Sequence, residues 1–188
     1  IAANKTRISE ENFEINKEGE RRFKFGVIEA DKRNRVINFQ EKPEHPAEIP
    51  GQPGYCWASM GNYLFKTDVL IDVLGRGYGL DFGNHVIPKM REDGMKLFVF
   101  PFDGYWRDVG DIASYYDSNM DLNRDAPGLN LFNTEWPIRT YGSKNPPTRL
   151  LINGKISTIS EGCDIEGIVE NCILSPGVRI GKNSYVQD

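Results

Sequence analysis

The sequence predicts a layered α/β domain with a mixed or parallel sheet, followed by a short parallel β-helix. Two observations carry this prediction. Segments with alternating or continuous apolar residues, which are typical of strands, alternate with segments whose apolar residues recur at helical spacing. Near the C-terminal end, apolar residues recur every six positions, which is typical of one side of a parallel β-helix.

The composition excludes several classes of protein. Of the 188 residues, 39% are hydrophobic and 27% are charged, as in a globular protein rather than a disordered or fibrous one. The longest apolar stretches fall far short of the roughly 20 residues that cross a bilayer, and the net charge of -4 comes with no dense basic block. We therefore expect neither a membrane nor a nucleic acid as a partner. Three cysteines without a CxxC pair argue against a disulfide framework or a zinc site and fit a reducing compartment.

The first predicted strands form a hairpin. Residues 23–27 and 36–39 carry alternating apolar side chains on either side of the polar turn 31–34. Residues 41–54 hold four prolines and two glycines, so we expect a surface loop there. The twenty residues at the start are polar with weak periodicity, and the missing start methionine leads us to expect part of a longer protein.

Further strands and helices alternate after the loop. The aromatic-rich residues 55–65 predict a buried strand, and residues 95–102 predict another. The expected helices run from Thr67 or Asp68 to Gly75, from Asp81 to Gly94 with Pro88 near the start, and from Asp111 through Leu122. This alternation is the basis of the predicted layered sheet.

A proline-rich segment and then a repeat follow. The prolines between residues 127 and 147 indicate a linker. We expect an α/β domain over residues 1–125, a linker over 126–149 and a second domain over 150–188. An interval of six residues separates Ile159 from Ile165, and the same interval joins Leu174, Ile180 and Val186. This period favours a parallel β-helix over the alternative of ordinary hairpins.

A lysine stands directly after a predicted strand, where α/β sheets bind ligands. In Glu41-Lys42-Pro43, Lys42 offers a permanent charge for a phosphate, and Pro43 fixes the chain beside it. The alternative is an exposed Lys42 in an ion pair with Glu41.

A second candidate is the string Tyr105-Trp106-Arg107-Asp108-Val109-Gly110, just before a helix. It combines an aromatic side chain, a cation and a carboxylate. Asp108 offers the hard oxygen ligand that Mg²⁺ prefers. The alternatives are that Asp108 pairs with Arg107 or caps the helix.

Other polar residues carry weaker signals. Asp81 stands at a helix start, where it is a cap or an acceptor for a sugar hydroxyl. Ser59 lies in a predicted buried strand near a glycine, as a core residue or a ligand contact. His45 and His85 have no cysteine or carboxylate at ligand spacing, so we expect them to be surface or structural residues.

Six strings occur in the order found in one family. The chain resembles ADP-glucose pyrophosphorylase (glucose-1-phosphate adenylyltransferase) from about residue 20 onward. The Glu-Lys-Pro and Trp-x-Asp-x-Gly elements are shared with other sugar nucleotidyltransferases, whereas the last two strings are closer to the ADP-glucose members. The strings are Phe25-Gly26-Val27, Phe39-Gln40-Glu41-Lys42-Pro43, Ala58-Ser59-Met60-Gly61, Asp81-Phe82-Gly83, Tyr105-Trp106-Arg107-Asp108-Val109-Gly110 and Trp136-Pro137-Ile138-Arg139-Thr140-Tyr141.

The resemblance implies a fold, a reaction and an assembly. The fold is part of a Rossmann-like nucleotidyltransferase domain with a mixed sheet, followed by the first turns of a left-handed parallel β-helix. The reaction makes ADP-glucose and pyrophosphate from ATP and α-D-glucose 1-phosphate, in glycogen or starch biosynthesis, with Mg²⁺ as the cofactor. The implied assembly is a homotetramer controlled by allosteric metabolites, located in the cytoplasm, or in the plastid of a plant.

The resemblance also implies roles for individual residues. Lys42 holds the phosphate of glucose 1-phosphate, and Asp108 is a Mg²⁺ ligand; these two are the implied catalytic residues. Gly26 lets the nucleotide sugar approach the backbone. The residues implied to shape the sugar site are Glu41, Ser59, Asp81, Phe82 and Trp106.

The sequence departs from the family pattern in its nucleotide-binding part. The glycine-rich loop with its catalytic arginine and lysine does not occur here, nor does the family's other metal-binding aspartate. We therefore expect the isolated chain to be inactive. The alternatives are a related thymidylyl- or uridylyltransferase and a non-catalytic regulatory subunit of the same fold. A hexapeptide-repeat acyltransferase is disfavoured because neither histidine lies in the repeat.

Overall fold

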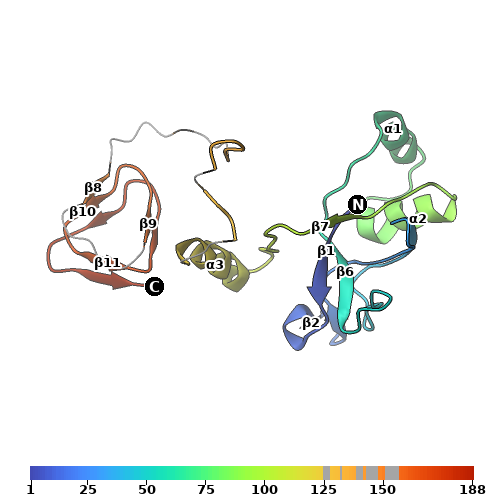
Figure 1. Cartoon of the computed structure of the whole chain (residues 1–188), viewed down its shortest axis with the longest axis horizontal. Coiled ribbons are helices and arrows are strands. Elements are labelled where there is room, and N and C mark those ends of the chain that lie inside the picture. Colours follow the sequence, from blue (N-terminus) through green and yellow to red (C-terminus); the bar gives the residue numbers. More distant parts are fainter. Residues whose placement is uncertain (125–127, 132, 139–141, 143–147, 151–156) are drawn as a thin grey trace. The chain divides into compact units, whose positions relative to one another are not determined.

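A computed structural model describes residues 1–124, 128–131, 133–138, 142, 148–150 and 157–188. The chain divides into two compact units, Ile1–Asp103 and Gly104–Asp188 (Figure 1), and each is described by itself. Part of the predicted linker, including Pro127 and Pro146, lies outside the described residues. The predicted domain limits at 125 and 149 therefore stay predictions.

The first unit contains a five-stranded mixed sheet, as predicted. Its strands lie in the order β5-β4-β6-β1-β7. β1 runs antiparallel to β6 and parallel to β7, and β4 is antiparallel to both of its neighbours. The strands are β1 (Ala2–Arg7), β4 (Val27–Ala30), β5 (Val36–Gln40), β6 (Tyr55–Ser59) and β7 (Phe100–Phe102).

The predicted hairpin is confirmed in its second half only. β4 and β5 pair antiparallel around the polar turn, where Asn34 adopts a φ of 60°. The residues before β4 instead form a separate small hairpin of β2 (Phe13–Ile15) and β3 (Arg21–Phe23), preceded by the 3-10 turn η1 (Glu10–Asn12). β1 and this small hairpin lie in the segment for which no element is expected from the sequence.

Two predicted strands are shorter than expected. β6 ends at Ser59 because the chain turns at Gly61, whose φ of 70° favours glycine. Residues 95–99 carry only isolated contacts to the β4–β5 turn, such as the bridge between Arg35 and Phe98. Only Phe100–Phe102 pair with β1, so β7 is limited to these residues.

The first helix, α1 (Thr67–Gly75), begins where predicted but is not capped as predicted. Its N-cap is Lys66, which makes no capping hydrogen bond through its side chain, so Thr67 and Asp68 lie inside the helix. Val73 is its fully buried residue and packs in the main hydrophobic core. Figure 1 shows α1 at the opposite end of this unit from the hairpin that contains β2.

The second helix is composite. Asp81 caps it as predicted, because its Oδ1 accepts a hydrogen bond from Asn84 N at 2.6 Å. A wide π-type turn, η2 (Phe82–Val86), then leads into α2 (Ile87–Glu92). Pro88 stands in the first turn of α2, where its missing N–H costs no helical hydrogen bond. The main core lies between the sheet and these helices and includes Ala3, Ile28, Phe39, Val73, Ile87 and Met90.

The second unit begins with the predicted third helix, α3 (Ile112–Met120). Asp111 Oδ1 accepts a hydrogen bond from Ser114 N at 2.7 Å and caps it. The 3-10 turn η3 (Asp121–Asn123) follows directly and holds the buried residues Asp121 and Asn123.

Short parallel strands then form what we name the parallel-strand coil, β8 to β14. They pair as three small sheets, β13-β10-β8, β12-β9 and β11-β14, and every pair is parallel, whereas ordinary hairpins make antiparallel pairs. The strands are β8 (Arg149–Leu150), β9 (Thr158–Ile159), β10 (Asp164–Ile165), β11 (Ile168–Glu170), β12 (Ile173–Leu174), β13 (Arg179–Ile180) and β14 (Tyr185–Gln187).

Four of the five residues of the predicted repeat stack in register in this coil, whereas the fifth, Val186, is 36% exposed and lies opposite Val169. Ile159 lies opposite Leu174, and Ile165 lies opposite Ile180. One corner of the coil passes over Gly167, where an added Cβ would lie 2.6 Å from the carbonyl oxygen of Ser184. A glycine is therefore required at this corner.

Candidate functional site

The centre of the candidate site is the half-buried carboxylate of Glu41, just after β5. Two glycines make room for it. A Cβ placed on Gly26 would lie 2.9 Å from Glu41 Oε2, and a Cβ placed on Gly83 would lie 3.0 Å from Glu41 Cδ. Both distances are shorter than a Cβ contact allows, so the absence of side chains at Gly26 and Gly83 sets the position of this carboxylate.

Two acids lie close together at this point. Burial raises the pKa of Glu41, the negative charge of Asp81 raises it further, and the charge of Lys42 opposes the rise. Asp81 stands at the start of η2, where its carboxylate accepts the bond from Asn84 N. Two carboxylates side by side are good acceptors for the hydroxyl groups of a sugar.

Ser59 joins the site from the end of β6. Its N–H donates to the carbonyl oxygen of Gly26 at 2.7 Å, and its Oγ accepts a bond of 3.4 Å from Gly61 N. The side chain also hydrogen-bonds the Tyr63 hydroxyl, whose pKa is raised by burial and by the nearby acids Glu41 and Asp81. Ser59 is therefore part of a polar cluster rather than an isolated core serine.

Tyr63 is a residue of this site that the sequence did not single out. Its ring stacks on that of Phe82, with centroids 5.4 Å apart and planes 27° apart, and Phe65 lies next to both rings, 5.6 Å from Phe82 and 6.2 Å from Tyr63. Aromatic rings of this kind pack against the C–H face of a sugar. The only signal in the sequence is that Tyr63 stands four residues after Ser59 in an aromatic stretch.

Lys42 lies next to Glu41 but points to a different acid. Its Nζ forms an ion pair of 2.8 Å with Glu14 Oε1, on β2, and the two side chains are 49% and 42% exposed. The ion pair of Lys42 is therefore formed with Glu14, while its charge also acts on Glu41. An exposed pair of this kind is weak, so Lys42 can exchange Glu14 for a phosphate at small cost.

The second unit holds the loop with Trp106 and Asp108. Arg107 pairs with Asp121, through Nη2 at 2.8 Å, and not with Asp108. Asp111, and not Asp108, caps α3. Both alternatives for Asp108 are therefore wrong, and its carboxylate is exposed. The site residues Gly26, Glu41, Ser59, Asp81 and Phe82 come together in the first unit, and their roles, like those of Trp106 and Asp108, stay predictions.

Asp108 is compatible with a Mg²⁺ site in which only one or two of the ligands come from the protein. Mg²⁺ is commonly held by one or two carboxylates together with waters and substrate phosphates. No group of three or more His, Cys, Asp or Glu side chains that could hold a metal occurs in the described part of the chain. The exposed carboxylate of Asp108 thus fits as one ligand in such a set.

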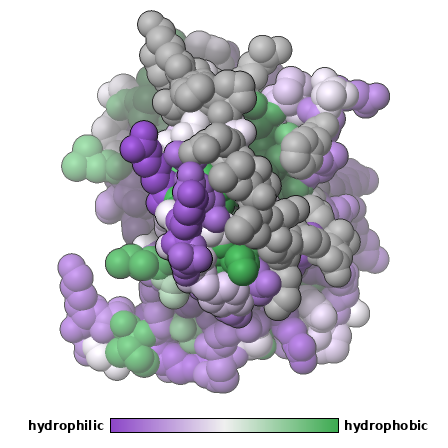
Figure 2. Space-filling view, turned by 90° about the vertical axis from the view of Figure 1, so that its left-hand side faces the viewer, coloured by the Kyte–Doolittle hydropathy of each residue, from purple (hydrophilic) through white to green (hydrophobic). Residues whose placement is uncertain are grey.

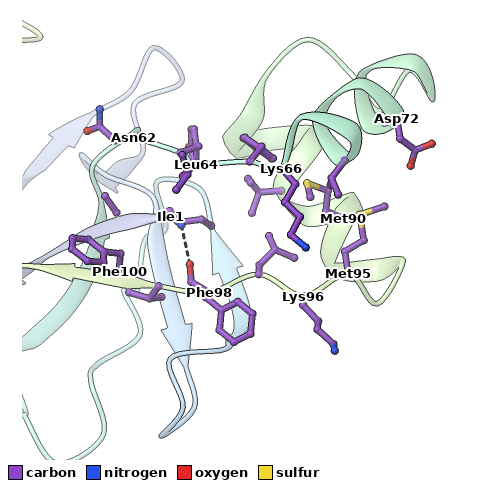
Figure 3. A pocket seen from close by; sticks show the side chains of 17 residues that line it. Ile1, Asn62, Leu64, Lys66, Asp72, Met90, Met95, Lys96, Phe98 and Phe100 are labelled. Atoms are coloured by element: carbon purple, nitrogen blue, oxygen red, sulfur yellow. Dashed lines mark hydrogen bonds between the residues drawn. The ribbon is translucent and has the colours of Figure 1, made fainter.

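A large groove of the first unit has a different character. It has a volume of about 1060 Å³ and is lined mainly by apolar residues around the first residue of the chain (Figure 3). The nitrogen of Ile1 donates to the carbonyl oxygen of Phe98 at 2.8 Å. Of the site residues described above, Tyr63 and Phe65 line the groove, whereas Glu41, Ser59 and Asp81 do not, so it does not share the polar groups of that site.

Figure 2 shows one face on which hydrophilic residues predominate and hydrophobic side chains occur in small separate groups. Among the described residues, no helix has the length and apolar character needed to span a bilayer. Trp136 of the last family string is 84% exposed. Arg139, Thr140 and Tyr141 of that string lie outside the described residues.

Comparisons with known proteins point in one direction. Residues 4–125 match the family described as Nucleotidyl transferase. A glucose-1-phosphate adenylyltransferase of Shewanella frigidimarina is 40% identical over 184 residues, which cover 87% of this chain and 44% of the relative. That of Trichlorobacter lovleyi is 41% identical over 189 residues, with 88% and 46% covered. That of Thermosipho africanus is 41% identical over 171 residues, with 87% and 40% covered. The chain thus spans less than half the length of these relatives.

Proposed function

This chain belongs to the nucleotidyl transferase family, and from that premise we propose that it carries the sugar-phosphate-binding part of a glucose-1-phosphate adenylyltransferase. The whole enzyme makes ADP-glucose and pyrophosphate from ATP and α-D-glucose 1-phosphate. The relatives of that name, at about 40% identity over 87% of the chain, support the choice of reaction.

The observation that carries the proposal is the position of Glu41 between Gly26 and Gly83, beside Asp81. Two acids and the hydroxyl pair of Ser59 and Tyr63 offer several acceptors and donors to the hydroxyl groups of one hexose. The Tyr63 and Phe82 rings offer an apolar face. Together they favour a sugar as the bound group.

In the proposed reaction, a phosphate oxygen of glucose 1-phosphate attacks the α-phosphorus of ATP. The bond from that phosphorus to the oxygen of the leaving pyrophosphate breaks. Transfers of this kind depend mainly on positioning and on neutralising phosphate charge. We assign Lys42 to the phosphate of the sugar, after release of Glu14, and Glu41, Ser59, Asp81 and Phe82 to the sugar itself. Gly26 leaves the space that the Glu41 carboxylate and the Phe39 ring occupy.

Two residues of the second unit complete the proposal. Trp106 is assigned to sugar binding by the family pattern, and Asp108 would hold Mg²⁺. When bound, Mg²⁺ supplies positive charge to the phosphate oxygens.

The proposal extends to the fold and assembly. We propose that the first unit belongs to a Rossmann-like domain and that the parallel-strand coil is the start of a left-handed parallel β-helix. The exclusively parallel pairing and the register of Ile165 on Ile180 support the second assignment. A homotetramer and control by allosteric metabolites are the assembly and regulation that we propose by resemblance.

Binding of glucose 1-phosphate tests the sugar-phosphate assignment directly. We expect the 188-residue chain to bind it in isothermal titration calorimetry and Lys42→Gln to weaken binding by about ten-fold, since one charge-assisted contact is lost. Lys17→Gln, at an exposed lysine of the β2–β3 hairpin, serves as the matched control. No binding, or equal affinity of Lys42→Gln and wild type, would contradict the proposal.

Pyrophosphate release tests the reaction and its alternatives. Glucose 1-phosphate and Mg²⁺ are supplied with ATP, dTTP or UTP in separate assays. We expect no release from the 188-residue chain alone. Release with ATP would show that the chain itself is catalytic, and release only with dTTP or UTP would assign it to thymidylyl- or uridylyltransferases.

A further inference from the structure

Asp121 is a buried carboxylate that no role discussed so far explains. It is 3% exposed and lies in η3, directly after α3. Its Oδ2 accepts hydrogen bonds from Arg107 Nε at 2.8 Å and from the Tyr105 hydroxyl at 3.0 Å. Its Oδ1 pairs with Arg124 Nη2 at 2.5 Å. Three residues therefore converge on one carboxylate.

The charge of this carboxylate is maintained by its partners. Burial acts to raise the pKa of Asp121, but the hydrogen bonds from Arg107 and Tyr105 and the charges of Arg107 and Arg124 outweigh it and lower the pKa. Two of the partners, Tyr105 and Arg107, flank Trp106 in the chain, and Arg107 directly precedes Asp108. The position of Asp121 thus determines where this loop can lie.

Asn123, two residues later, makes the corresponding contacts to the parallel-strand coil. It is 7% exposed. Its Nδ2 donates to the carbonyl oxygen of Cys172 at 3.1 Å, and its Oδ1 accepts from Thr158 Oγ1 at 2.8 Å. The three-residue turn η3 therefore holds the loop through Asp121 and the coil through Asn123.

We propose that Asp121 is a positioning residue for the loop that carries Trp106 and Asp108. It acts through Arg107 and Tyr105, and Asn123 anchors it to the coil. The inference rests on the proposed function, since Trp106 and Asp108 take their roles from it. It adds a residue, outside the string 105–110, on which those roles depend.

The test follows Trp106 itself. In the 188-residue chain, Trp57→Phe and Trp136→Phe leave Trp106 as the single tryptophan. We expect Asp121→Asn to raise the acrylamide quenching constant of Trp106 by about two- to three-fold, because a charge-assisted bond becomes a weaker neutral one. Asp117→Asn, at an exposed acid of α3, is the matched control and is expected to leave quenching unchanged.

A second readout separates positioning from general loss of structure. Cys163 and Cys172 are buried in the coil, so their reaction with a thiol reagent reports its unfolding. Positioning by Asp121 predicts increased quenching of Trp106 with thiol reaction rates within about two-fold of the parent chain. Unchanged quenching of Trp106 overturns the inference. Increased quenching accompanied by a similar increase in the thiol reaction rates overturns it as well.

The binding assay distinguishes this inference from the function on which it rests. The wild-type chain and Asp121→Asn are each titrated with glucose 1-phosphate in the presence of Mg²⁺. If the wild-type chain shows no binding, the proposed function fails, and the Trp106 and thiol readouts still decide whether Asp121 positions the loop. If the wild-type chain binds, we expect Asp121→Asn to bind about three-fold or more weakly through the lost order of Trp106; equal affinity overturns the inference.

Discussion

The carboxylate of Glu41 occupies the space in which a side chain at Gly83 would lie: a Cβ there would come within 3.0 Å of Glu41 Cδ. Because this carboxylate is the end of a flexible side chain and can move aside, we expect Gly83→Ala to displace it and to lower the free energy of unfolding of the first unit by at most about 1 kcal/mol. Urea unfolding followed by fluorescence measures the change. Gly75→Ala is the control: no atom lies within 4 Å of a Cβ placed there, so it should raise the free energy of unfolding by up to about 1 kcal/mol through helix propensity alone.

A double-mutant cycle assigns this cost to Glu41. In a Glu41→Ala background, Gly83→Ala should cost less, because the atoms that meet the new methyl group are gone. Gly26→Ala should remain costly in that background, because its Cβ would also lie 2.8 Å from Phe39 Cζ. Equal costs of Gly83→Ala in both backgrounds would show that Glu41 does not determine the need for glycine.

Glu41→Gln should stabilise the chain while weakening sugar binding. Because the pKa of Glu41 is raised by burial and then by Asp81, the folded state holds its proton more tightly than the unfolded state. Glu41 therefore stabilises the folded state at a pH below its pKa in the unfolded chain. This contribution is lost as the pH rises through its pKa in the folded chain. At pH 7 we expect the free energy of unfolding of Glu41→Gln to be higher than that of the wild type by roughly a few tenths of a kcal/mol, after solvent screening.

The pH dependence supplies the check on this prediction. Urea unfolding of wild type and Glu41→Gln at pH 7, 5 and 4 should show a difference that shrinks toward the acid end. Asp68→Asn, at an exposed acid of α1, is the control. A wild-type chain more stable than Glu41→Gln at pH 7 would mean that ionised Glu41 gains more from its surroundings than burial costs.

Glu14 is expected to compete with phosphate for Lys42. The 2.8 Å ion pair between these residues must open before Lys42 can bind a ligand. Removing the charge with Glu14→Gln should strengthen binding of glucose 1-phosphate by about two- to five-fold, which corresponds to a weak exposed pair. Calorimetric titration measures this, with Glu10→Gln as control because Glu10 pairs with Arg21. Unchanged affinity would exclude the competition.

The parallel-strand coil should depend on its inward residues alone. Ile165 is fully buried, whereas Ile168 is 38% exposed. We expect Ile165→Ala to destabilise the coil by about 2–4 kcal/mol and Ile168→Ala by less than about 1 kcal/mol. The reaction of Cys163 and Cys172 with a thiol reagent in rising urea measures the difference. Equal effects would contradict the inward stacking.

The fold was predictable where local signals agree with tertiary contacts. Asp111 caps α3, the β4–β5 turn is polar, and Ile165 stacks on Ile180. β1 could not be predicted, because its charged residues become a strand only through pairing with β6 and β7 on both sides. Conversely, the apolar residues after Ser59 have strand-like composition but turn away at Gly61.

The candidate site was predictable as a set of residues but not as an arrangement. Glu41, Ser59 and Asp81 stand far apart in the sequence, and only folding brings their side chains to the same place. Nothing in the order of residues shows that Gly26 and Gly83 leave space for one carboxylate, or that Lys42 pairs with Glu14. Tyr63 was missed because a tyrosine in an aromatic stretch is most simply a core residue.

The corner over Gly167 has a consequence for how the coil tolerates changes in length. Two residues, 166 and 167, join β10 to β11, whereas four, 181 to 184, join β13 to β14. Val169 nevertheless lies opposite Val186. The longer corner still lies close over Gly167, with the carbonyl oxygens of Gly181 and Ser184 near it, and the strands after both corners stay paired, so a corner can lengthen without shifting the next side of the coil. Insertions and deletions are therefore best accommodated at the vertices, provided that the residue beneath has no side chain.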